Sequence, residues 1–230
     1  MKSYFITGTD TGVGKTTITA ALAACIKKLG VDVGVMKPIA TGIPQKSGFK
    51  SHDASVLCQS CGVDDAEDLV NPVFVPLPAS PYDVSKTLDL KFDRAIIFEK
   101  FEKLKSLHKM LLVEGIGGMM TPISRDYFVA DLIKGMGLET IIVTRSTLGT
   151  LNHTMMTVKT CHDYKIQIKG IIVNNYDEKG GIAEKNSPAT IYEITNIPIL
   201  GTLPFVKDYQ NLEMMISHVE KNIDLKSLIS

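Results

Sequence analysis

The 230-residue sequence has no tryptophan and few other aromatic residues, and its basic and acidic residues balance at 25 each. A net charge of zero gives no support for a nucleic-acid partner, which normally needs a basic surface. No apolar run approaches the roughly 18 residues that cross a bilayer. A strand-like run begins at Tyr4 and leaves no room for a signal peptide. We therefore expect a cytoplasmic protein that binds neither nucleic acid nor membrane.

Cysteine is also sparse, with four residues in the chain. So few cysteines favour free thiols in a reducing compartment over a disulfide framework. Cys58 and Cys61 have the C-x-x-C spacing of redox and zinc sites, but a zinc site needs a second pair of ligands. The scattered histidines and the two remaining cysteines, Cys25 and Cys161, do not form one. We interpret Cys58 and Cys61 as small apolar residues on a helix that starts near Asp53.

Apolar, strand-like runs alternate with helical patterns along the chain. This alternation predicts an α/β fold in which helices cover both faces of a mostly parallel sheet. We expect residues 1–230 to form one domain, because a chain of this length leaves little room for a second core. The expected strands are 4–7, 33–36, 110–113, 140–143, 170–173 and 197–200, and the expected helices are 17–29, 53–61, 93–108, 128–135, 150–164 and 186–195.

The segment Gly8–Thr16, with the sequence GTDTGVGKT, joins the first expected strand to the first expected helix. A strand, a glycine-rich turn and a helix that begins at Gly-Lys-Thr are typical of a phosphate-binding P-loop. The glycines let backbone N–H groups surround phosphates, and the helix N-terminus adds partial positive charge. We expect Lys15 to contact the β- and γ-phosphates and the Thr16 hydroxyl to bind Mg²⁺. The loop is a variant, because Thr9 stands where the usual motif has its first glycine.

Ligands of parallel α/β sheets bind at the carboxyl ends of the strands, so the residues after each run are candidates. Lys37 follows the second run and is expected to face the P-loop, although such a lysine is often only a solvated charge. Glu114 follows the third run and suits a carboxylate that positions metal or water, with a structural role as the alternative. Asp53 is equally compatible with a helix N-cap and with a second magnesium ligand.

Two further segments are each compatible with two interpretations. Residues 76–81 contain three prolines and predict a rigid loop, either as a pocket wall or as scaffolding. Residues 146–153 open a helix whose N–H groups offer a second anion site, which suits a substrate carboxylate. Capping by Ser146 or Thr150 alone explains that local sequence nearly as well.

The last two expected strands end in residues that suit a nucleobase. Asn174 and Asn175 carry amides whose donor and acceptor match the edge of adenine, although asparagine is also common in turns. Pro204 and Phe205 end the final run on the same side of the sheet.

Together these segments resemble the dethiobiotin synthetase family. The motifs follow the family's order with similar gaps, which makes the set far more specific than the P-loop alone. The resemblance implies a homodimer of P-loop NTPase-type α/β subunits with sites at the subunit interface. It also implies that ATP, CO₂ and Mg²⁺ are used to close a ureido ring on the diamine 7,8-diaminononanoate. The motifs are GTDTGVGKT (8–16), KPIATG (37–42), HDA (52–54), PASP (78–81), VEGIGG (113–118), LGTLNH (148–153), VNN (173–175) and GTLP (201–204).

The resemblance implies a role for each site residue. Lys37 matches the family's catalytic lysine and acts together with Lys15, while an acidic residue expected near the ribose is Asn211 here. The implied magnesium ligands are Thr16, Asp53 and Glu114. The implied ATP-binding residues are Gly12, Val13, Gly14, Lys15, Thr16, Thr17, Asp53, Glu114, Gly115, Ile116, Gly117, Asn174, Asn175, Pro204, Phe205 and Val206. The implied substrate-binding residues are Thr11, Lys37, Thr41, Gly149, Thr150, Leu151 and Asn152.

Three rival functions share parts of this pattern. A nucleotide-driven switch of the cell-division or plasmid-partition type has the same fold, but it carries a lysine where this chain has Asp10. The synthetase half of a glutamine-dependent amidoligase needs a glutaminase domain, which 230 residues cannot hold. A regulatory module that has lost catalysis is not expected to keep both lysines and both carboxylates of the site. The sequence therefore favours an ATP-dependent dethiobiotin synthetase, with a non-catalytic or switch-type P-loop ATPase as the alternative.

Overall fold

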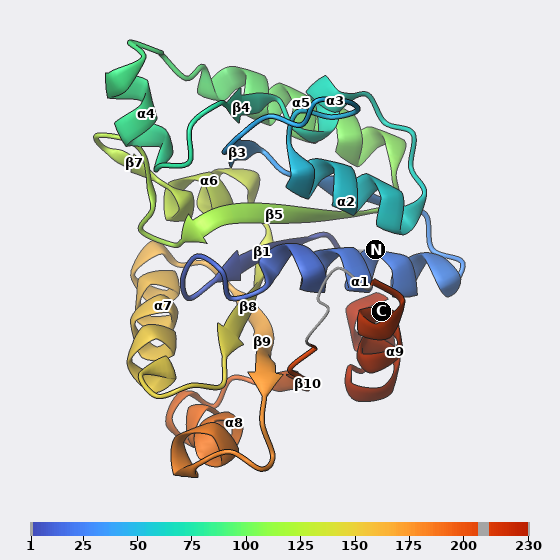
Figure 1. The fold of residues 1–230 in the computed structure, drawn as a ribbon, viewed down its shortest axis with the longest axis vertical. Helices are drawn as coiled ribbons and strands as arrows, with labels where there is room; N and C mark the ends of the chain where they lie inside the picture. The colour runs from blue at the N-terminus through green and yellow to red at the C-terminus, as the bar shows by residue number, and fades with distance from the viewer. Residues whose placement is uncertain (1, 207–211, 230) are drawn as a thin grey trace.

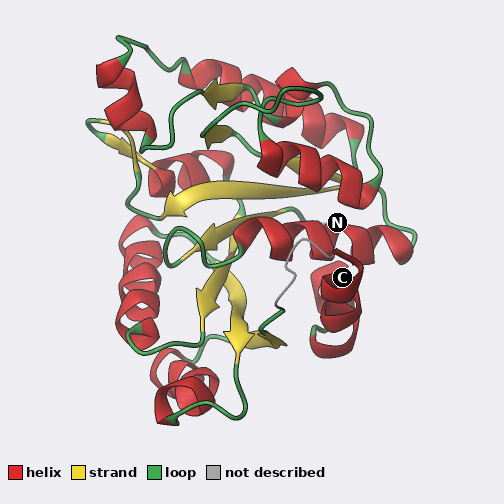
Figure 2. Ribbon diagram, viewed as in Figure 1, coloured by secondary structure: helices red, strands yellow, loops and turns green. Residues whose placement is uncertain are grey.

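The computed structural model describes residues 2–206 and 212–229 of the chain. Within these residues a six-stranded sheet crosses the molecule, with helices on both faces (Figures 1 and 2). Its strands are β1 (Tyr4–Gly8), β2 (Val33–Met36), β5 (Met110–Gly118), β8 (Glu139–Arg145), β9 (Ile168–Tyr176) and β10 (Ile199–Pro204). In space they follow the order β10-β9-β8-β1-β5-β2, and every neighbouring pair is parallel. The predicted parallel α/β architecture is confirmed.

The sheet separates the hydrophobic core into two layers, and helices cover each layer. The first layer contains α1 (Lys15–Lys28), α2 (His52–Cys61), α9 (Leu212–Asn222) and α10 (Lys226–Ile229). The second contains α5 (Arg94–Leu107), α6 (Val129–Met136), α7 (Thr150–Tyr164) and α8 (Ile182–Thr195). Strand side chains alternate between the layers because successive residues of a strand point to opposite faces. Tyr4 and Ile6 belong to the first layer and Phe5 to the second.

Several short elements were not predicted from the sequence. Strands of two or three residues and helices of one or two turns are too short to develop a periodic apolar pattern. Pro81 was expected in a loop but is the first residue of a helix, where proline is favoured, and Ser80 caps that helix by accepting the Asp83 N–H. These elements are β3 (Ile39–Thr41), α3 (Glu67–Val70), β4 (Val73–Val75), α4 (Pro81–Thr87), β6 (Pro122–Ser124) and β7 (Tyr127–Phe128).

The strand β5 is longer than predicted, and this changes the position of Glu114. Its glycine-rich end remains in the sheet, where Gly118 pairs with Gly8, so Glu114 lies inside the strand opposite Ile6. Side-chain alternation then directs Glu114 to the same face as Leu112, which is the face covered by α1 and α2. The predicted end of the strand at Val113 was therefore wrong. In the longer strand, the Glu114 carboxylate lies near the N-termini of α1 and α2.

Among the described residues, no helix is long and apolar enough to cross a membrane.

Candidate active site

A cavity of about 1130 Å³ opens at the carboxyl ends of β2, β5 and β9. Its walls also include residues 78–80, which confirms the pocket-wall interpretation of that proline-rich loop. The cavity is also lined by His52, which belongs to the HDA motif, and by five residues that the sequence did not single out: Val56, Thr121, Pro122, Leu212 and Met215. The predicted site residues that the cavity brings together are Thr11, Gly12, Gly14, Lys15, Thr16, Thr17, Lys37, Thr41, Asp53, Glu114, Ile116, Gly117, Asn174, Asn175, Phe205 and Val206.

The P-loop ends at Gly14, which is the N-cap of α1. Gly14 has a φ of 97°, and a Cβ on it would lie 2.2 Å from Asn174 Nδ2, so only glycine fits. No side chain of the described residues caps α1, so its first N–H groups are left for an anion in the cavity. Asn174 Nδ2 donates to the Val13 carbonyl at 2.9 Å and ties the end of β9 to this loop. The geometry is that of a phosphate cradle.

Lys15 lies in the first turn of α1 and is buried, with 7% of its surface exposed. Its ammonium donates to the Asp10 carbonyl at 2.9 Å. Burial, and next the nearby charge of Lys37, lower the pKa of Lys15 to about 8. An anion bound in the cavity would oppose both causes, since it favours the charged form of the lysine.

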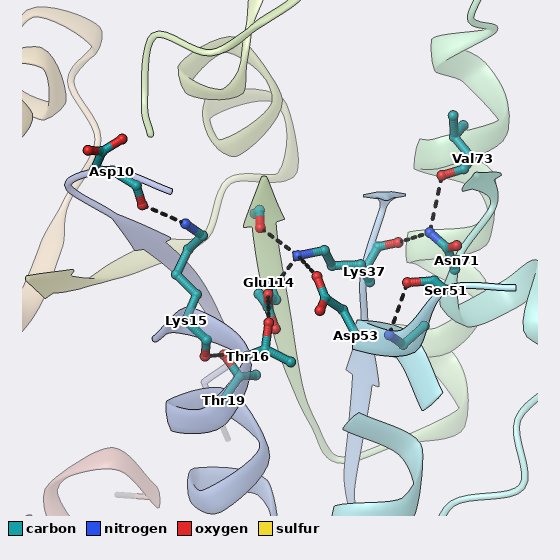
Figure 3. Close-up of polar contacts among 12 residues, drawn as sticks. Asp10, Lys15, Thr16, Thr19, Lys37, Ser51, Asp53, Asn71, Val73 and Glu114 are labelled. Atoms are coloured by element: carbon teal, nitrogen blue, oxygen red, sulfur yellow. Dashed lines mark hydrogen bonds and ion pairs between the residues drawn. The ribbon is translucent and has the colours of Figure 1, made fainter. Parts of the chain in front are cut away.

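Lys37 is the centre of a buried polar cluster (Figure 3). Its Nζ lies 2.6 Å from Glu114 Oε1, 2.9 Å from Asp53 Oδ2 and 3.0 Å from the carbonyl of Gly115. The Thr16 hydroxyl donates to the same Glu114 oxygen at 2.7 Å. Residues from α1, β5, α2 and the end of β2 thus meet at one point. The alternative that Lys37 is only a solvated charge was wrong, because its side chain is 4% exposed.

Burial and charge act in opposite directions on this cluster. Burial by itself lowers the pKa of Lys37, but the carboxylates of Glu114 and Asp53 outweigh it and raise that pKa above the ordinary value. Burial also raises the pKa of Asp53, yet Lys37 more than offsets this and the net shift is downward. For Glu114, which is completely buried, burial wins over the neighbouring lysine and the pKa is raised. We take Lys37 as charged and Asp53 as its ionised partner, because Asp53 is the more exposed of the two acids.

The residues predicted to hold Mg²⁺ form a suitable oxygen donor set. Asp53 is not the N-cap of α2, because Ser51 Oγ accepts the Ala54 N–H and fills that role. The Asp53 carboxylate is directed at Lys37 instead. The second oxygen of Glu114, Oε2, is buried without a hydrogen-bond partner among the described residues. The unpaired oxygen of Glu114 lies near the Thr16 hydroxyl and the Asp53 carboxylate. This set fits Mg²⁺, which prefers oxygen ligands and usually keeps several of its waters.

The start of α7 lies apart from this cavity. Gly149 is its N-cap without a side-chain hydrogen bond, so the predicted alternative of capping by Ser146 or Thr150 was wrong. Ser146 Oγ instead donates to the Glu184 carbonyl at 2.7 Å, and Thr150 Oγ1 bonds Thr144 Oγ1 at 2.8 Å. Of Gly149 to Asn152, only Asn152 lines a second hollow, of about 540 Å³, together with Thr9 and Asp10.

Only some of the residues predicted to bind the nucleobase line the cavity. Asn175, with a φ of 55°, and Phe205, which is 66% exposed, line the cavity beside Asn174. One N–H of Asn174 Nδ2 is already used by the P-loop, and its buried Oδ1 lacks a partner among the described residues. Pro204 ends β10 and does not line the cavity, whereas Asn211 lies outside the described residues. The contact of Asn174 with adenine stays a prediction.

The four cysteines are buried free thiols. Cys58 and Cys61 lie in α2, and their interpretation as small apolar helix residues is confirmed. Burial raises the pKa of the Cys58 thiol to about 12 and that of Cys61 to about 11. In the part of the chain that the structure describes, no group of three His, Cys, Asp or Glu residues could hold a metal ion.

Comparison with solved structures reveals the same fold in cell-division and partition proteins. The chain superimposes on a ParA family ATPase from Chlorobium tepidum TLS with a TM-score of 0.56, at 16% identity, over 96% of this chain and 93% of the other. The MinC:MinD cell division protein complex of Aquifex aeolicus gives 0.58 at 15% identity, over 95% and 88%. At such identities the likeness concerns the fold alone.

A family model described as an AAA domain matches residues 2–213. With its P-loop and cavity, the chain is therefore a P-loop ATPase domain of this type. At the sequence level it is 51% identical, over the full length of both chains, to the ATP-dependent dethiobiotin synthetase BioD of Nitrosopumilus maritimus (strain SCM1). The enzyme of the same name from Thermodesulfovibrio yellowstonii is 42% identical over 99% of this chain and 98% of its own. The chain belongs to the ATP-dependent dethiobiotin synthetase family, whose members are ligases of biotin biosynthesis.

Proposed function

We propose that this chain closes a ureido ring on 7,8-diaminononanoate with CO₂, ATP and Mg²⁺. The observation that carries the proposal is the convergence of Lys15, Lys37 and a hydroxyl-carboxylate cluster on one cavity beside a phosphate cradle. Membership of the dethiobiotin synthetase family supports it independently. Similarity to partition and cell-division ATPases concerns only the fold, so it gives the switch-type alternative no functional support.

The proposed reaction has three balanced steps. An amine of the substrate adds to CO₂ and loses a proton, which forms a carbamate. A carbamate oxygen attacks the γ-phosphorus of ATP, so that a carbamic-phosphoric mixed anhydride forms and ADP leaves. The second amine attacks the carbonyl carbon of the anhydride, loses a proton and expels phosphate. No side-chain nucleophile is required in this sequence.

The two lysines supply fixed positive charge where the reaction accumulates negative charge. The N–H groups at the start of α1, with Lys15, are proposed to hold the β- and γ-phosphates. Lys37 is proposed to contact the carbamate and the transferring phosphoryl group, where a preorganised cation is most effective. Thr11 and Thr41 line the same cavity and are proposed to contact the diamine.

We assign the magnesium site to Thr16, Asp53 and Glu114. Bound there, Mg²⁺ would neutralise charge between the β- and γ-phosphates. The same two carboxylates hold Lys37 in this structure. If both carboxylates served as metal ligands, Lys37 would lose these partners and its ammonium would be available to the substrate.

We further propose a two-fold homodimer in which the start of α7 reaches the neighbouring site and holds the substrate carboxylate. Leu148, Leu151 and Met156 expose apolar surface along this end of the helix, which a second copy would cover. The contribution of the helix end should be modest, about 0.3–1 kcal/mol, as for an exposed helix terminus. Light scattering at nanomolar concentration, run alongside turnover, tests this arrangement. A monomer with full activity would exclude it.

The test of the proposed function is phosphate release from ATP with components omitted in turn. Release should require 7,8-diaminononanoate, bicarbonate and Mg²⁺ together, and omission of any one should reduce it to background. Steady phosphate release without the diamine would instead identify a switch-type ATPase.

A further inference from the structure

Asn71 lies outside the cavity lining but directly behind Lys37 (Figure 3). It follows α3 and precedes Pro72, and its side chain is buried with 4% of its surface exposed. Its Nδ2 donates to the Lys37 carbonyl at 2.6 Å and to the Val73 carbonyl at 3.1 Å. Both hydrogens of the amide nitrogen are thus used on backbone oxygens.

The orientation of this amide follows from its partners. Two carbonyl oxygens can only accept, so the atom that faces them must be the nitrogen. Its oxygen, Oδ1, is buried without a partner among the described residues. A buried acceptor without a hydrogen bond costs free energy. We therefore interpret the two N–H donors of Asn71, which offset this cost, as the reason that an amide occupies this position.

The backbone of Lys37 is held from the same segment on both sides. The Lys37 N–H donates to the Val70 carbonyl at 2.8 Å, and its carbonyl receives the Asn71 amide. The next residue, Pro38, has no N–H to donate, and its carbonyl accepts the Val73 N–H at 3.3 Å. Residues 70–73 therefore hydrogen-bond to Lys37 and Pro38, which connect β2 to β3.

We propose that Asn71 is a positioning residue for Lys37, which fixes the backbone from which the ammonium reaches the reacting groups. This inference rests on the proposed function, because it assumes that Lys37 acts on the substrate. A long, flexible side chain can deliver its charge to one point only if its backbone is held. A misplacement near 1 Å is enough to lower a rate by about 10²-fold.

The test is a double-mutant cycle in the full-length protein, with ATP, Mg²⁺, bicarbonate and 7,8-diaminononanoate. Asn71→Leu keeps the approximate shape and removes both donors. We expect it to lower kcat roughly 10- to 100-fold while the Kd of ATP changes less than about threefold. In a Lys37→Gln background the same substitution should have almost no further effect, since the group that it positions is absent.

Two further variants separate positioning from simple loss of stability. Tyr4→Phe removes another buried bond from side chain to backbone, Tyr4 Oη to the Leu228 carbonyl at 3.1 Å, away from the cavity. It should lower the unfolding temperature without lowering kcat. If Asn71→Leu does not fold, Asn71→Ser, which keeps one donor, should fold and show a smaller loss of kcat.

The outcomes separate this inference from the proposed function. A slow Lys37→Gln together with a normal Asn71→Leu would overturn only the role of Asn71. Equal, multiplicative losses in both backgrounds would make Asn71 a purely structural residue and also overturn it. A normal rate of ring closure by Lys37→Gln would remove the proposed role of Lys37 itself.

Discussion

Lys37 Nζ and Glu114 Oε1 are 2.6 Å apart and both side chains are buried. Taking the charged ammonium of Lys37 out of water is costly, and this cost is repaid only when the ammonium has good partners. The carbonyl of Gly115 and the carboxylate of Asp53 are further partners of the ammonium, and the hydroxyl of Thr16 donates to Glu114. The cluster therefore holds a charged lysine inside the site, at the place where the proposed reaction needs positive charge.

Replacing Lys37 should affect the rate more than nucleotide binding. By analogy with the loss of one preorganised donor, Lys37→Gln should lower turnover roughly 10²–10³-fold, about 3–4 kcal/mol. The ATP affinity measured by calorimetry should change less than about tenfold, because the proposed contact of Lys37 belongs to the transition state. Lys37→Arg should not restore the rate, since a planar guanidinium does not replace a compact ammonium. Lys134→Gln, at an exposed lysine, is the matched control. A parallel loss of ATP affinity would make Lys37 a nucleotide ligand instead.

The two acidic residues of the cluster should set the metal requirement. Glu114→Gln and Asp53→Asn should each lower turnover, leave the fold intact and raise the Mg²⁺ concentration for half-maximal rate by about tenfold or more, which corresponds to about 1.4 kcal/mol. Asp68→Asn, at an exposed carboxylate that pairs with Lys100, should leave this concentration unchanged. Magnesium titrations of turnover, with circular dichroism to check folding, measure both effects. An unchanged titration for either variant would return that residue to a structural role.

The larger part of the fold could be predicted because long, periodic apolar runs directly reflect burial. The position of Glu114 could not, since the glycines after it carry no apolar pattern that marks a continuing strand. The meeting of Lys37 with Asp53 and Glu114 depends on packing between distant segments, so sequence order alone left Asp53 undecided. Asn71 was missed for the same reason: its partners are backbone carbonyls, and no side-chain motif reveals them.

A second, partly buried charge cluster should make stability depend on pH. His108 Nδ1 lies 2.9 Å from Asp32 Oδ1, and His108 Nε2 lies 2.9 Å from Asp65 Oδ2. The ring packs so closely on β2 that a Cβ on Gly34 would lie 2.3 Å from it. Burial lowers the pKa of His108, but its hydrogen bonds to the two carboxylates outweigh burial and raise that pKa above the ordinary 6.5.

Because the folded-state pKa is the higher one, the stabilisation from His108 is complete below pH 6.5 and is lost as pH rises through the raised pKa. Hydrogen bonds to charged groups contribute about 1.5–3 kcal/mol. Urea unfolding at pH 6 and pH 9 should therefore show a smaller fall in unfolding free energy for His108→Gln than for the unmodified chain. The same fall in both proteins would assign the pH dependence to other groups.

The four cysteine thiols should react slowly with thiol reagents in the folded protein. Burial raises the pKa of Cys25 to about 11 and that of Cys161 to about 12, as it does for the two thiols of α2. Thiolates are the reactive form, so a thiol reagent at pH 8 should label the native chain slowly and all four cysteines rapidly in urea. The double substitution Cys58→Ala and Cys61→Ala should leave turnover unchanged. Rapid labelling of the native protein, or a loss of turnover in the double variant, would contradict a purely packing role.

The central claim is that phosphoryl transfer from ATP drives the insertion of one carbon into the diamine. The direct measurement is mass spectrometry of the product formed from carbon-13 bicarbonate, 7,8-diaminononanoate and Mg-ATP, with phosphate measured in the same samples. The account predicts a cyclic urea that carries one labelled carbon and a ratio of one phosphate per ring closed. Phosphate release without labelled product would contradict it.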